Sequence, residues 1–294
     1  MIVFKGSLVA LVTPFSRDNR VDYACLKRLI DFHVEQGSSG LVIAGTTGEA
    51  ATLSRAEHTE LIARAVELSA GRLPIIAGTG SNSTSQTVDL SREIGDTGIE
   101  ALLLVVPYYN KPMQEGMYRH FSTIADAVDK PVMMYNVPGR TVADMLPETV
   151  ARLAKHGNIF GIKEATGDID RLAAIKALVD DDFMLYSGDD FTLLPFIEQG
   201  GHGVVTVSGN VAPGAVAELC RLALAGEKEK AKALDATLQP LNKALFVESN
   251  PIPVKWAVAQ LGLMEAHIRL PLTDYESQYH AQMRAAMAGA GVKL

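Results

Sequence analysis

The chain has 294 residues, of which 48% are hydrophobic, and a formal net charge of −7. It is long enough to bury a large core, and its acidic balance, with no basic stripe among aromatic residues, argues against nucleic acid as a partner. Cys25 and Cys220 are its only cysteines, which excludes a disulfide framework. The apolar start of the chain lacks signal-peptide features, and no stretch approaches the roughly 18–20 apolar residues that span a bilayer. We therefore expect a cytoplasmic protein.

Short apolar runs, each ending in polar, glycine or proline residues, recur along the chain. They are nearly continuous in Val, Ile and Leu and do not alternate with polar residues, which is typical of strands buried on both faces of a parallel sheet. Eight such runs occur, at residues 7–15, 40–49, 73–80, 101–110, 131–139, 159–167, 183–190 and 202–210.

The stretches between these runs carry helix signals. Residues 21–37 place apolar side chains at helical spacing and end at a glycine. Residues 54–71 open with Ser54 and Glu57, the S-x-x-E pattern of a capping box. Residues 146–157 have proline near the start and glycine at the end, the usual asymmetry of helix termini.

Eight strand–helix units in series predict an α/β fold, a closed (β/α)8 TIM barrel. The alternative is an open doubly wound sheet, which usually carries G-x-G-x-x-G after its first strand. Here the first run ends in VTPF, and only GTGSNS at 78–83 comes close. Strand signals stop after about residue 222. We therefore expect a catalytic barrel over 1–222 and a C-terminal helical region over 223–294 packed on it.

In a (β/α)8 barrel the chemistry lies at the carboxyl ends of the strands. None of the seven histidines closes a run, which disfavours a metal site, and two aspartates after the seventh run disfavour phosphate. The run ends read Thr13-Pro14, Thr46-Thr47-Gly48-Glu49, Gly78-Thr79, Tyr108-Tyr109, Tyr135-Asn136, Lys163-Glu164, Gly188-Asp189-Asp190 and Ser208-Gly209-Asn210.

A lysine among tyrosines and threonines fits imine chemistry. Burial in an apolar barrel mouth lowers the pKa of a lysine, and the neutral amine then attacks a ketone. Hydroxyls relay protons without adding charge, and the GTTGE turn offers hydroxyls and N–H groups to a carboxylate. The residues taken together favour a Schiff-base lyase or aldolase that acts on a keto acid.

Each of these residues also has a purely structural explanation. Lys163 would then be solvated or paired with Glu164, the tyrosines would pack at the rim, and the threonines would only form a turn. For Asp189-Asp190 we expect only a turn and a helix N-cap.

Six segments carry a resemblance to a known family. They are GTTGEAATLS (45–54), PYYNKPMQEG (107–116), YNVPGRT (135–141), GIKEATGD (161–168), YSGDD (186–190) and NPIPVKWA (250–257). In this order they closely resemble the bacterial 4-hydroxy-tetrahydrodipicolinate synthase family, and the resemblance runs from about residue 6 to 273. It implies a TIM barrel with C-terminal helices that condenses pyruvate with L-aspartate 4-semialdehyde in lysine and diaminopimelate biosynthesis.

The resemblance also implies roles for residues of this chain. Lys163 would be the Schiff-base nucleophile, Tyr135 the proton donor and acceptor, and Thr46 and Tyr109 would complete the proton relay. Tyr109 would enter a neighbouring subunit's site, so a dimer is the smallest working unit and a dimer-of-dimers tetramer is expected. No metal, nucleotide or other cofactor is expected.

The substrate-binding set implied by the resemblance has four members. Thr47 would hold the pyruvate carboxylate, helped by the backbone near Val205, and Gly188 would belong to the same set. Arg140 would receive the carboxylate of the semialdehyde, a bidentate task that suits a guanidinium. Relatives such as N-acetylneuraminate lyase and keto-deoxy-sugar-acid aldolases share the barrel and the lysine but usually lack this arginine. They remain the alternative, and a non-catalytic binding barrel is a second one, although it would not need the full Lys-Tyr-Thr set.

The chain departs from lysine-inhibited relatives at their allosteric pocket. Those relatives carry serine, histidine and glutamate at three positions where this chain has Ala50, Arg55 and Gln86. His58, Asn82 and Tyr108 still match. Because a charge-assisted acceptor is lost and a cation is added, the sequence predicts weak or absent inhibition by lysine.

Overall fold

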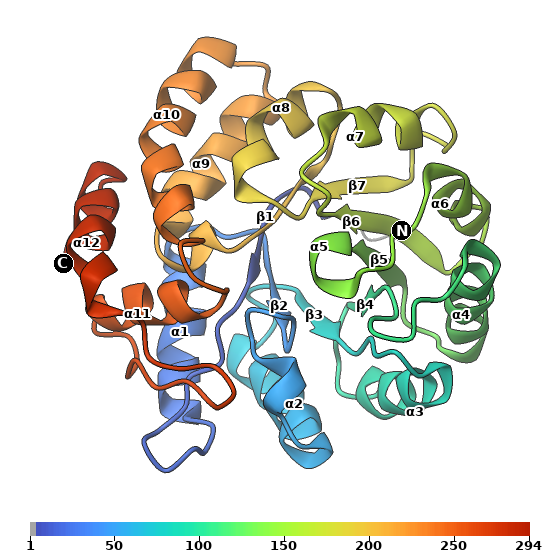
Figure 1. The fold of residues 1–294 in the computed structure, drawn as a ribbon, viewed down its shortest axis with the longest axis horizontal. Helices are drawn as coiled ribbons and strands as arrows, with labels where there is room; N and C mark the ends of the chain where they lie inside the picture. The colour runs from blue at the N-terminus through green and yellow to red at the C-terminus, as the bar shows by residue number, and fades with distance from the viewer. Residues whose placement is uncertain (1–3) are drawn as a thin grey trace.

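The structure is a computed structural model that describes residues 4–294. Its centre is a closed barrel of parallel strands in the order of the chain (Figure 1), which confirms the predicted fold. The eight strands are β1 (Gly6–Ala10), β2 (Gly40–Ile43), β3 (Ile75–Gly78), β4 (Ala101–Val105), β5 (Val132–Asn136), β6 (Ile159–Glu164), β7 (Met184–Ser187) and β8 (Gly203–Thr206).

Helices surround the barrel and follow the strands in turn (Figure 1). The predicted capping box is present, since Ser54 accepts from the Glu57 N–H and Glu57 accepts from the Ser54 N–H. The helices of the barrel are α1 (Tyr23–Glu35), α2 (Arg55–Ser69), α3 (Thr84–Gly95), α4 (Gln114–Ala127), α5 (Pro138–Thr141), α6 (Pro147–Ala154), α7 (Ile169–Lys176), α8 (Leu193–Glu198) and α9 (Pro213–Leu224).

Three further helices, α10 (Lys228–Ala244), α11 (Ile252–Gln260) and α12 (His280–Gly289), form the C-terminal helical region. They lie together at one side of the barrel, and α10 packs against α9 and α12 (Figure 1). The expected boundary after residue 222 falls inside α9, which also packs on β1. The division into two domains stays a prediction.

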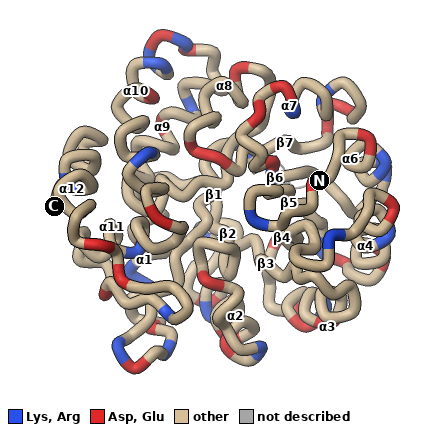
Figure 2. Tube along the Cα trace, in the orientation of Figure 1, with Lys and Arg blue, Asp and Glu red and all other residues tan. Residues whose placement is uncertain are grey.

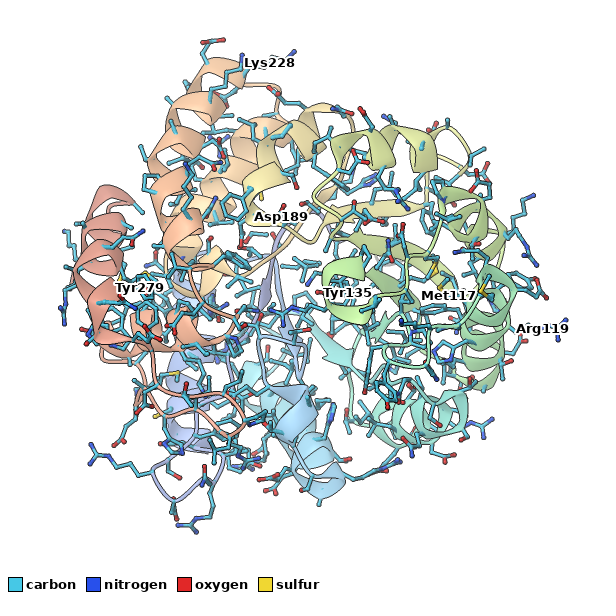
Figure 3. All side chains as sticks on the ribbon, in the orientation of Figure 1. Met117, Arg119, Tyr135, Asp189, Lys228 and Tyr279 are labelled. Carbon is cyan, nitrogen blue, oxygen red and sulfur yellow. The ribbon has the colours of Figure 1, made fainter. Side chains whose placement is uncertain are left out.

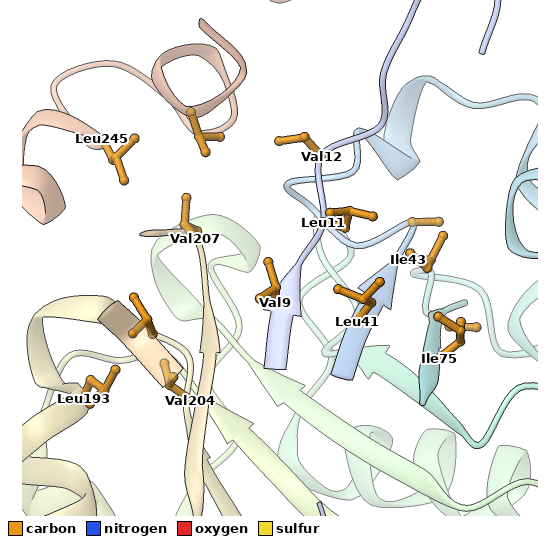
Figure 4. Close-up of a cluster of buried hydrophobic side chains, with 14 of the residues drawn as sticks. Val9, Leu11, Val12, Leu41, Ile43, Ile75, Leu193, Val204, Val207 and Leu245 are labelled. Atoms are coloured by element: carbon orange, nitrogen blue, oxygen red, sulfur yellow. The ribbon is translucent and has the colours of Figure 1, made fainter. Parts of the chain in front are cut away.

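Two apolar layers hold the barrel together, because successive side chains of a strand point to opposite faces. Leu8, Val42 and Val205 point into the barrel with the cluster that fills it. Val9, Leu41 and Val204 belong to the outer cluster between strands and helices, and Figure 4 shows them with Leu193 of α8. Because the side chains on both faces of each strand are apolar, the strands appear in the sequence as continuous apolar runs.

Charged residues lie mainly on the outer helices and loops (Figure 2). Among residues 4–294, no helix combines the length and apolar character needed to cross a membrane.

Candidate active site

A cavity of about 150 Å³ opens at the carboxyl ends of the strands. Tyr135 and Asp189, which both line this cavity, are labelled in Figure 3. The cavity brings together six of the residues singled out from the sequence, namely Thr46, Thr47, Tyr135, Arg140, Lys163 and Gly188. They come from β2, β5, β6 and β7 or the segments that follow these strands, so the closed barrel gathers residues more than a hundred positions apart.

Lys163 extends from β6 into this cavity and is only 6% exposed. Its strand pairs with β5 so that Lys163 lies beside Tyr135, and its Nζ is 4.1 Å from the centre of the Tyr135 ring. Burial lowers the pKa of Lys163 to about 7, against the opposing charge of Asp190 and with a smaller lowering contribution from Arg140. A large share of the amine is therefore neutral and nucleophilic near pH 7.

Glu164 points to the other face of β6, away from Lys163. It accepts hydrogen bonds from Asn136 Nδ2 at 3.1 and 3.3 Å and from the Thr166 N–H at 2.9 Å. The alternative that Lys163 is solvated or paired with its neighbour is therefore wrong, and the lysine is free to react in the cavity.

Tyr135 is 7% exposed and supplies a hydroxyl next to the amine. Burial raises its pKa, while the charge of Arg140 and a hydrogen bond with Thr46 oppose the rise. The phenol therefore stays protonated at neutral pH, so it can give a proton and take it back within one reaction.

The turn at residues 45–49, which follows β2, carries both threonines of the cavity. The Thr47 hydroxyl accepts a hydrogen bond of 3.0 Å from Asn250 Nδ2, and the Thr13 hydroxyl donates to the Gly48 carbonyl at 2.6 Å. These bonds fix the turn from two sides, and its Thr46 and Thr47 line the same cavity as Lys163.

Gly188, which follows β7, also lines the cavity, at a point where a side chain has no room. A Cβ at this position would lie 2.9 Å from Lys163 Cε and 2.6 Å from the Ala165 Cβ. Glycine is therefore required for the lysine to extend into the cavity.

Arg140 lies on α5 at the mouth of the cavity and is exposed. Its Nη2 donates to the Asn250 carbonyl at 3.2 Å. The segment that carries Arg140 is anchored through Asp144. Asn136 Nδ2 donates to Asp144 Oδ1 at 2.8 Å, and Arg171 forms an ion pair with Asp144. The guanidinium is therefore held at the entrance but keeps donors for a ligand.

Two expected site residues lie outside the cavity. Val205 is fully buried in the apolar interior of the barrel. Tyr109 is 87% exposed and has a left-handed backbone, with φ of 73°, while Tyr108 beside it is 41% exposed. Within one chain, Tyr109 is therefore not part of the group around Lys163.

The expected allosteric residues lie around α2, α3 and the loops beside them. His58 is buried and its Nε2 lies 2.7 Å from the Gly78 carbonyl oxygen. Arg55 is not an isolated cation, because its Nη2 and Nε bond Glu93 at 2.6 and 2.9 Å. The others are Ala50 in a short 3₁₀ helix (Ala50–Thr52), Asn82, Gln86 exposed on α3, and Tyr108.

The expectation for Asp189-Asp190 is confirmed for one residue and wrong for the other. Asp189 accepts from the Phe191 N–H as a cap. Asp190 is 3% exposed and accepts from the Thr206 hydroxyl and from the N–H groups of Val207 and Ser208. It is a buried carboxylate that ties β7 to the end of β8 and acts on the pKa of Lys163.

Asn250 also contributes to the site, although the sequence reasoning gave it no role. It lines the cavity and bonds both Thr47 and Arg140. Its segment, NPIPVKWA, carried the resemblance, and that was the available signal. In the described part of the chain, no group of three or more His, Cys, Asp or Glu residues is arranged to hold a metal ion.

Comparison with known proteins gives a consistent result. Residues 3–290 match the model of the dihydrodipicolinate synthetase family. A Teredinibacter turnerae protein named 4-hydroxy-tetrahydrodipicolinate synthase is 52% identical over 289 residues, which cover 98% of this chain and 99% of the relative.

Solved structures agree with the sequence comparison. The chloride-inhibited dihydrodipicolinate synthase from Acinetobacter baumannii, complexed with pyruvate, has a TM-score of 0.96 and 47% identity, covering 99% of this chain and 100% of that one. A structure described as the first monomeric dihydrodipicolinate synthase variant has a TM-score of 0.96 and 40% identity, covering 99% of this chain and 98% of that one.

Proposed function

Because the chain belongs to the dihydrodipicolinate synthetase family, we propose that it condenses pyruvate with L-aspartate 4-semialdehyde to give 4-hydroxy-tetrahydrodipicolinate. The observation that carries the proposal is Lys163, whose buried amine lies 4.1 Å from the Tyr135 ring centre in a cavity that also holds Thr46 and Thr47. A neutral amine beside a protonated phenol is what imine formation with a keto acid needs.

The reaction follows from these groups. The amine of Lys163 attacks the ketone carbon of pyruvate, Tyr135 passes protons to and from the oxygen, and water leaves as the imine forms. Loss of a methyl proton gives an enamine, whose carbon attacks the aldehyde of the semialdehyde. The amino group of the semialdehyde then attacks the imine carbon and displaces Lys163. One water is lost overall, and the reaction involves no net oxidation or reduction.

Each remaining residue of the site has one task in the proposed reaction. Thr47, helped by the backbone near Val205 and with Gly188 in the same cavity, holds the pyruvate carboxylate, and Thr46 passes protons between Tyr135 and the solvent side. Arg140 at the mouth receives the carboxylate of the semialdehyde. This use of Arg140 favours the synthase over N-acetylneuraminate lyase and over keto-deoxy-sugar-acid aldolases.

The test of the function uses the native protein. Borohydride reduction with pyruvate should add one reduced pyruvyl group to the peptide that holds GIKEATGD, and pyruvate should be consumed together with the semialdehyde. Label on another lysine, such as Lys155 or Lys111, would contradict the assignment. Efficient cleavage of N-acetylneuraminate would favour the alternative.

The working form is proposed to be a homo-oligomer, at least a dimer and expected to be a dimer of dimers. Exposed Tyr108, Tyr109 and Met113 on one loop support this, because large apolar side chains seldom gather on a free surface. Tyr109 would then complete the proton relay in the neighbouring subunit. A monomeric variant among the relatives makes sedimentation of the native protein the necessary check. We place the protein in the cytoplasm and expect it to need no cofactor.

Arg140→Ala is expected to separate the two substrates. Loss of one charge-assisted contact costs about 1.5–3 kcal/mol, so kcat/KM for the semialdehyde should fall roughly ten- to a hundredfold. Pyruvate imine formation should remain nearly intact when it is measured well above pH 7, where Lys163 is neutral with or without the charge of Arg140.

The matched variant is Arg140→Lys, which keeps the charge but loses the paired donors of the guanidinium. It should recover only part of the use of the semialdehyde. Equal losses for both substrates in Arg140→Ala would instead indicate that Arg140 only supports the loop around Asn250.

Inhibition by free lysine is expected to be weak or absent. Lysine brings two ammonium groups, and Gln86 offers no negative charge to either of them, while Ala50 lacks a hydroxyl. The carboxylate of Glu93 on the same surface is already paired with Arg55, so it is not free for the ammonium groups of lysine. Initial rates with saturating pyruvate across a lysine titration are the measurement, and half-inhibition below the millimolar range would contradict the prediction. Arg55→His with Gln86→Glu should restore part of the sensitivity.

A further inference from the structure

A fully buried ion pair links the C-terminal helical region to the turn at residues 45–49. Lys255 Nζ of α11 lies 2.5 Å from Glu49 Oε1, and each side chain is 1% exposed. In every other ion pair among residues 4–294, at least one side chain is more than 30% exposed. This pair therefore needs its own explanation.

Stability is a weak explanation for such a pair. Taking two charges out of water costs much of what their attraction returns, and apolar side chains of similar size often serve as well. Burial lowers the pKa of Lys255 to about 8, and the charge of Glu49 opposes the decrease. The Lys255 ammonium is thus largely protonated at neutral pH. What the pair offers the protein is a fixed position for the two side chains that it joins.

Both hydrogen-bond donors to the Glu49 carboxylate come from the C-terminal part of the chain. Its second carboxylate oxygen accepts from the Arg269 N–H at 3.2 Å. The Lys255 ammonium and the Arg269 guanidinium both lie over the Phe15 ring, at 4.4 and 4.1 Å from its centre. Residues about two hundred positions away in sequence therefore hold the last residue of this turn.

The turn needs such a hold because its backbone is unfavourable. Ala44, just before the turn, and Glu49, its last residue, have φ of 54° and 56°, a left-handed conformation that costs energy for any residue with a Cβ. Thr46 and Thr47 lie between them and line the cavity. Release of Glu49 would let the turn relax and move both hydroxyls away from Lys163.

We propose that Lys255 is a positioning residue that, through Glu49, fixes the 45–49 turn so that Thr46 and Thr47 face the reacting amine. The C-terminal helical region is then a part of the keto-acid site and not only a support for the barrel. The proposal deepens the proposed function and rests on it for its kinetic consequence, whereas its structural consequence is measured without any substrate.

The first measurement is hydrogen exchange of peptides covering residues 41–53 in the free protein. Lys255→Met should raise exchange at 45–49 by about tenfold or more, because the strained turn loses its anchor. Since Lys255→Met leaves Glu49 buried and unpaired, Glu49→Gln with Lys255→Met is the second variant. It carries no orphaned charge, so it should fold with near-native thermal stability and still show the faster exchange.

The second measurement is steady-state kinetics of the same proteins. Misplacement by about 1 Å can cost on the order of a hundredfold, so kcat/KM for pyruvate should fall roughly ten- to a hundredfold, with a raised KM for pyruvate. The KM for the semialdehyde should stay within about twofold, because Arg140 is on α5 and not on the turn that Glu49 holds. Lys255→Arg, which keeps the charge and donors, should recover part of the loss.

The matched control is Ser69→Ala. Ser69 is buried at the α2–β3 connection, at the opposite end of the barrel, where its hydroxyl donates to the Leu73 carbonyl at 2.7 Å and accepts from the Leu73 N–H at 3.1 Å. Its loss should lower thermal stability and leave both the exchange of the turn and the KM for pyruvate unchanged.

Two results would overturn the proposal. Unchanged exchange at 45–49 in Lys255→Met and in the double variant would show that the pair does not hold the turn, whatever reaction the protein catalyses. A native KM for pyruvate in the double variant would show that the hold does not matter for the site. If the native protein forms no borohydride-trapped adduct with pyruvate, the proposed function fails instead, and the exchange result alone decides the role of the pair.

Discussion

Lys163→Ala is expected to abolish the reduced pyruvyl adduct and to lower turnover by ~10⁴-fold or more, since removal of a nucleophile ends covalent catalysis. The fold should tolerate the change, because Lys163 forms no ion pair with its neighbour Glu164 and its side chain extends into a cavity. Borohydride trapping followed by peptide mass analysis, together with the rate of product formation, measures both effects.

Adduct formation by the native protein should also depend on pH in one direction. The pKa of Lys163 is lowered from 10.5 to about 7 by burial. The ammonium form predominates below that value and the nucleophilic amine above it, so the rate of imine formation should rise through about pH 7 and then level off. A rise centred near pH 10 would mean that the reacting lysine is exposed. Retention of the adduct in Lys163→Ala would remove the assignment altogether.

The barrel and its reactive strand ends could be predicted because they depend on local patterns. Continuous apolar runs indicate strands buried on two faces, and the residues at the carboxyl end of each run are those expected at the barrel mouth. Which of Lys163 and Glu164 points inward could not be decided in this way, since both follow the same run. The register of β6 beside β5 decides it, by placing Lys163 next to Tyr135.

Other parts of the site depend on contacts that no local pattern contains. Asp190 resembles a turn residue in sequence, but Thr206 of β8 and the two residues that follow the strand supply three donors that make it a buried acceptor. Lys255 resembles a charged residue on the surface of a helix, yet it bonds Glu49 from 206 positions away. Such partners can be found only when the chain is closed into the barrel and the C-terminal helices are placed against it.

Tyr135→Phe is expected to lower kcat by ~10²–10⁴-fold, the usual contribution of a positioned proton donor and acceptor. The change removes only the hydroxyl and keeps the ring that lies 4.1 Å from Lys163 Nζ, so the packing around the amine is preserved. The KM for pyruvate should change little, because Thr47 and its bond from Asn250 remain in place. Borohydride trapping should be slow but still directed to Lys163.

Tyr186→Phe provides the matched control for this prediction. Tyr186 is a fully buried tyrosine on β7, beside Lys163 on the other side, but its hydroxyl donates to the Phe4 carbonyl and takes no part in the cavity. Its loss should cost about 1 kcal/mol of unfolding free energy, as for one buried hydrogen bond, and leave kcat nearly unchanged. If both variants kept native turnover, protons would have to reach the imine by a route other than Tyr135. If both lost turnover equally, the effect would come from the packing of the barrel interior, because only Tyr135, and not Tyr186, lines the cavity of Lys163.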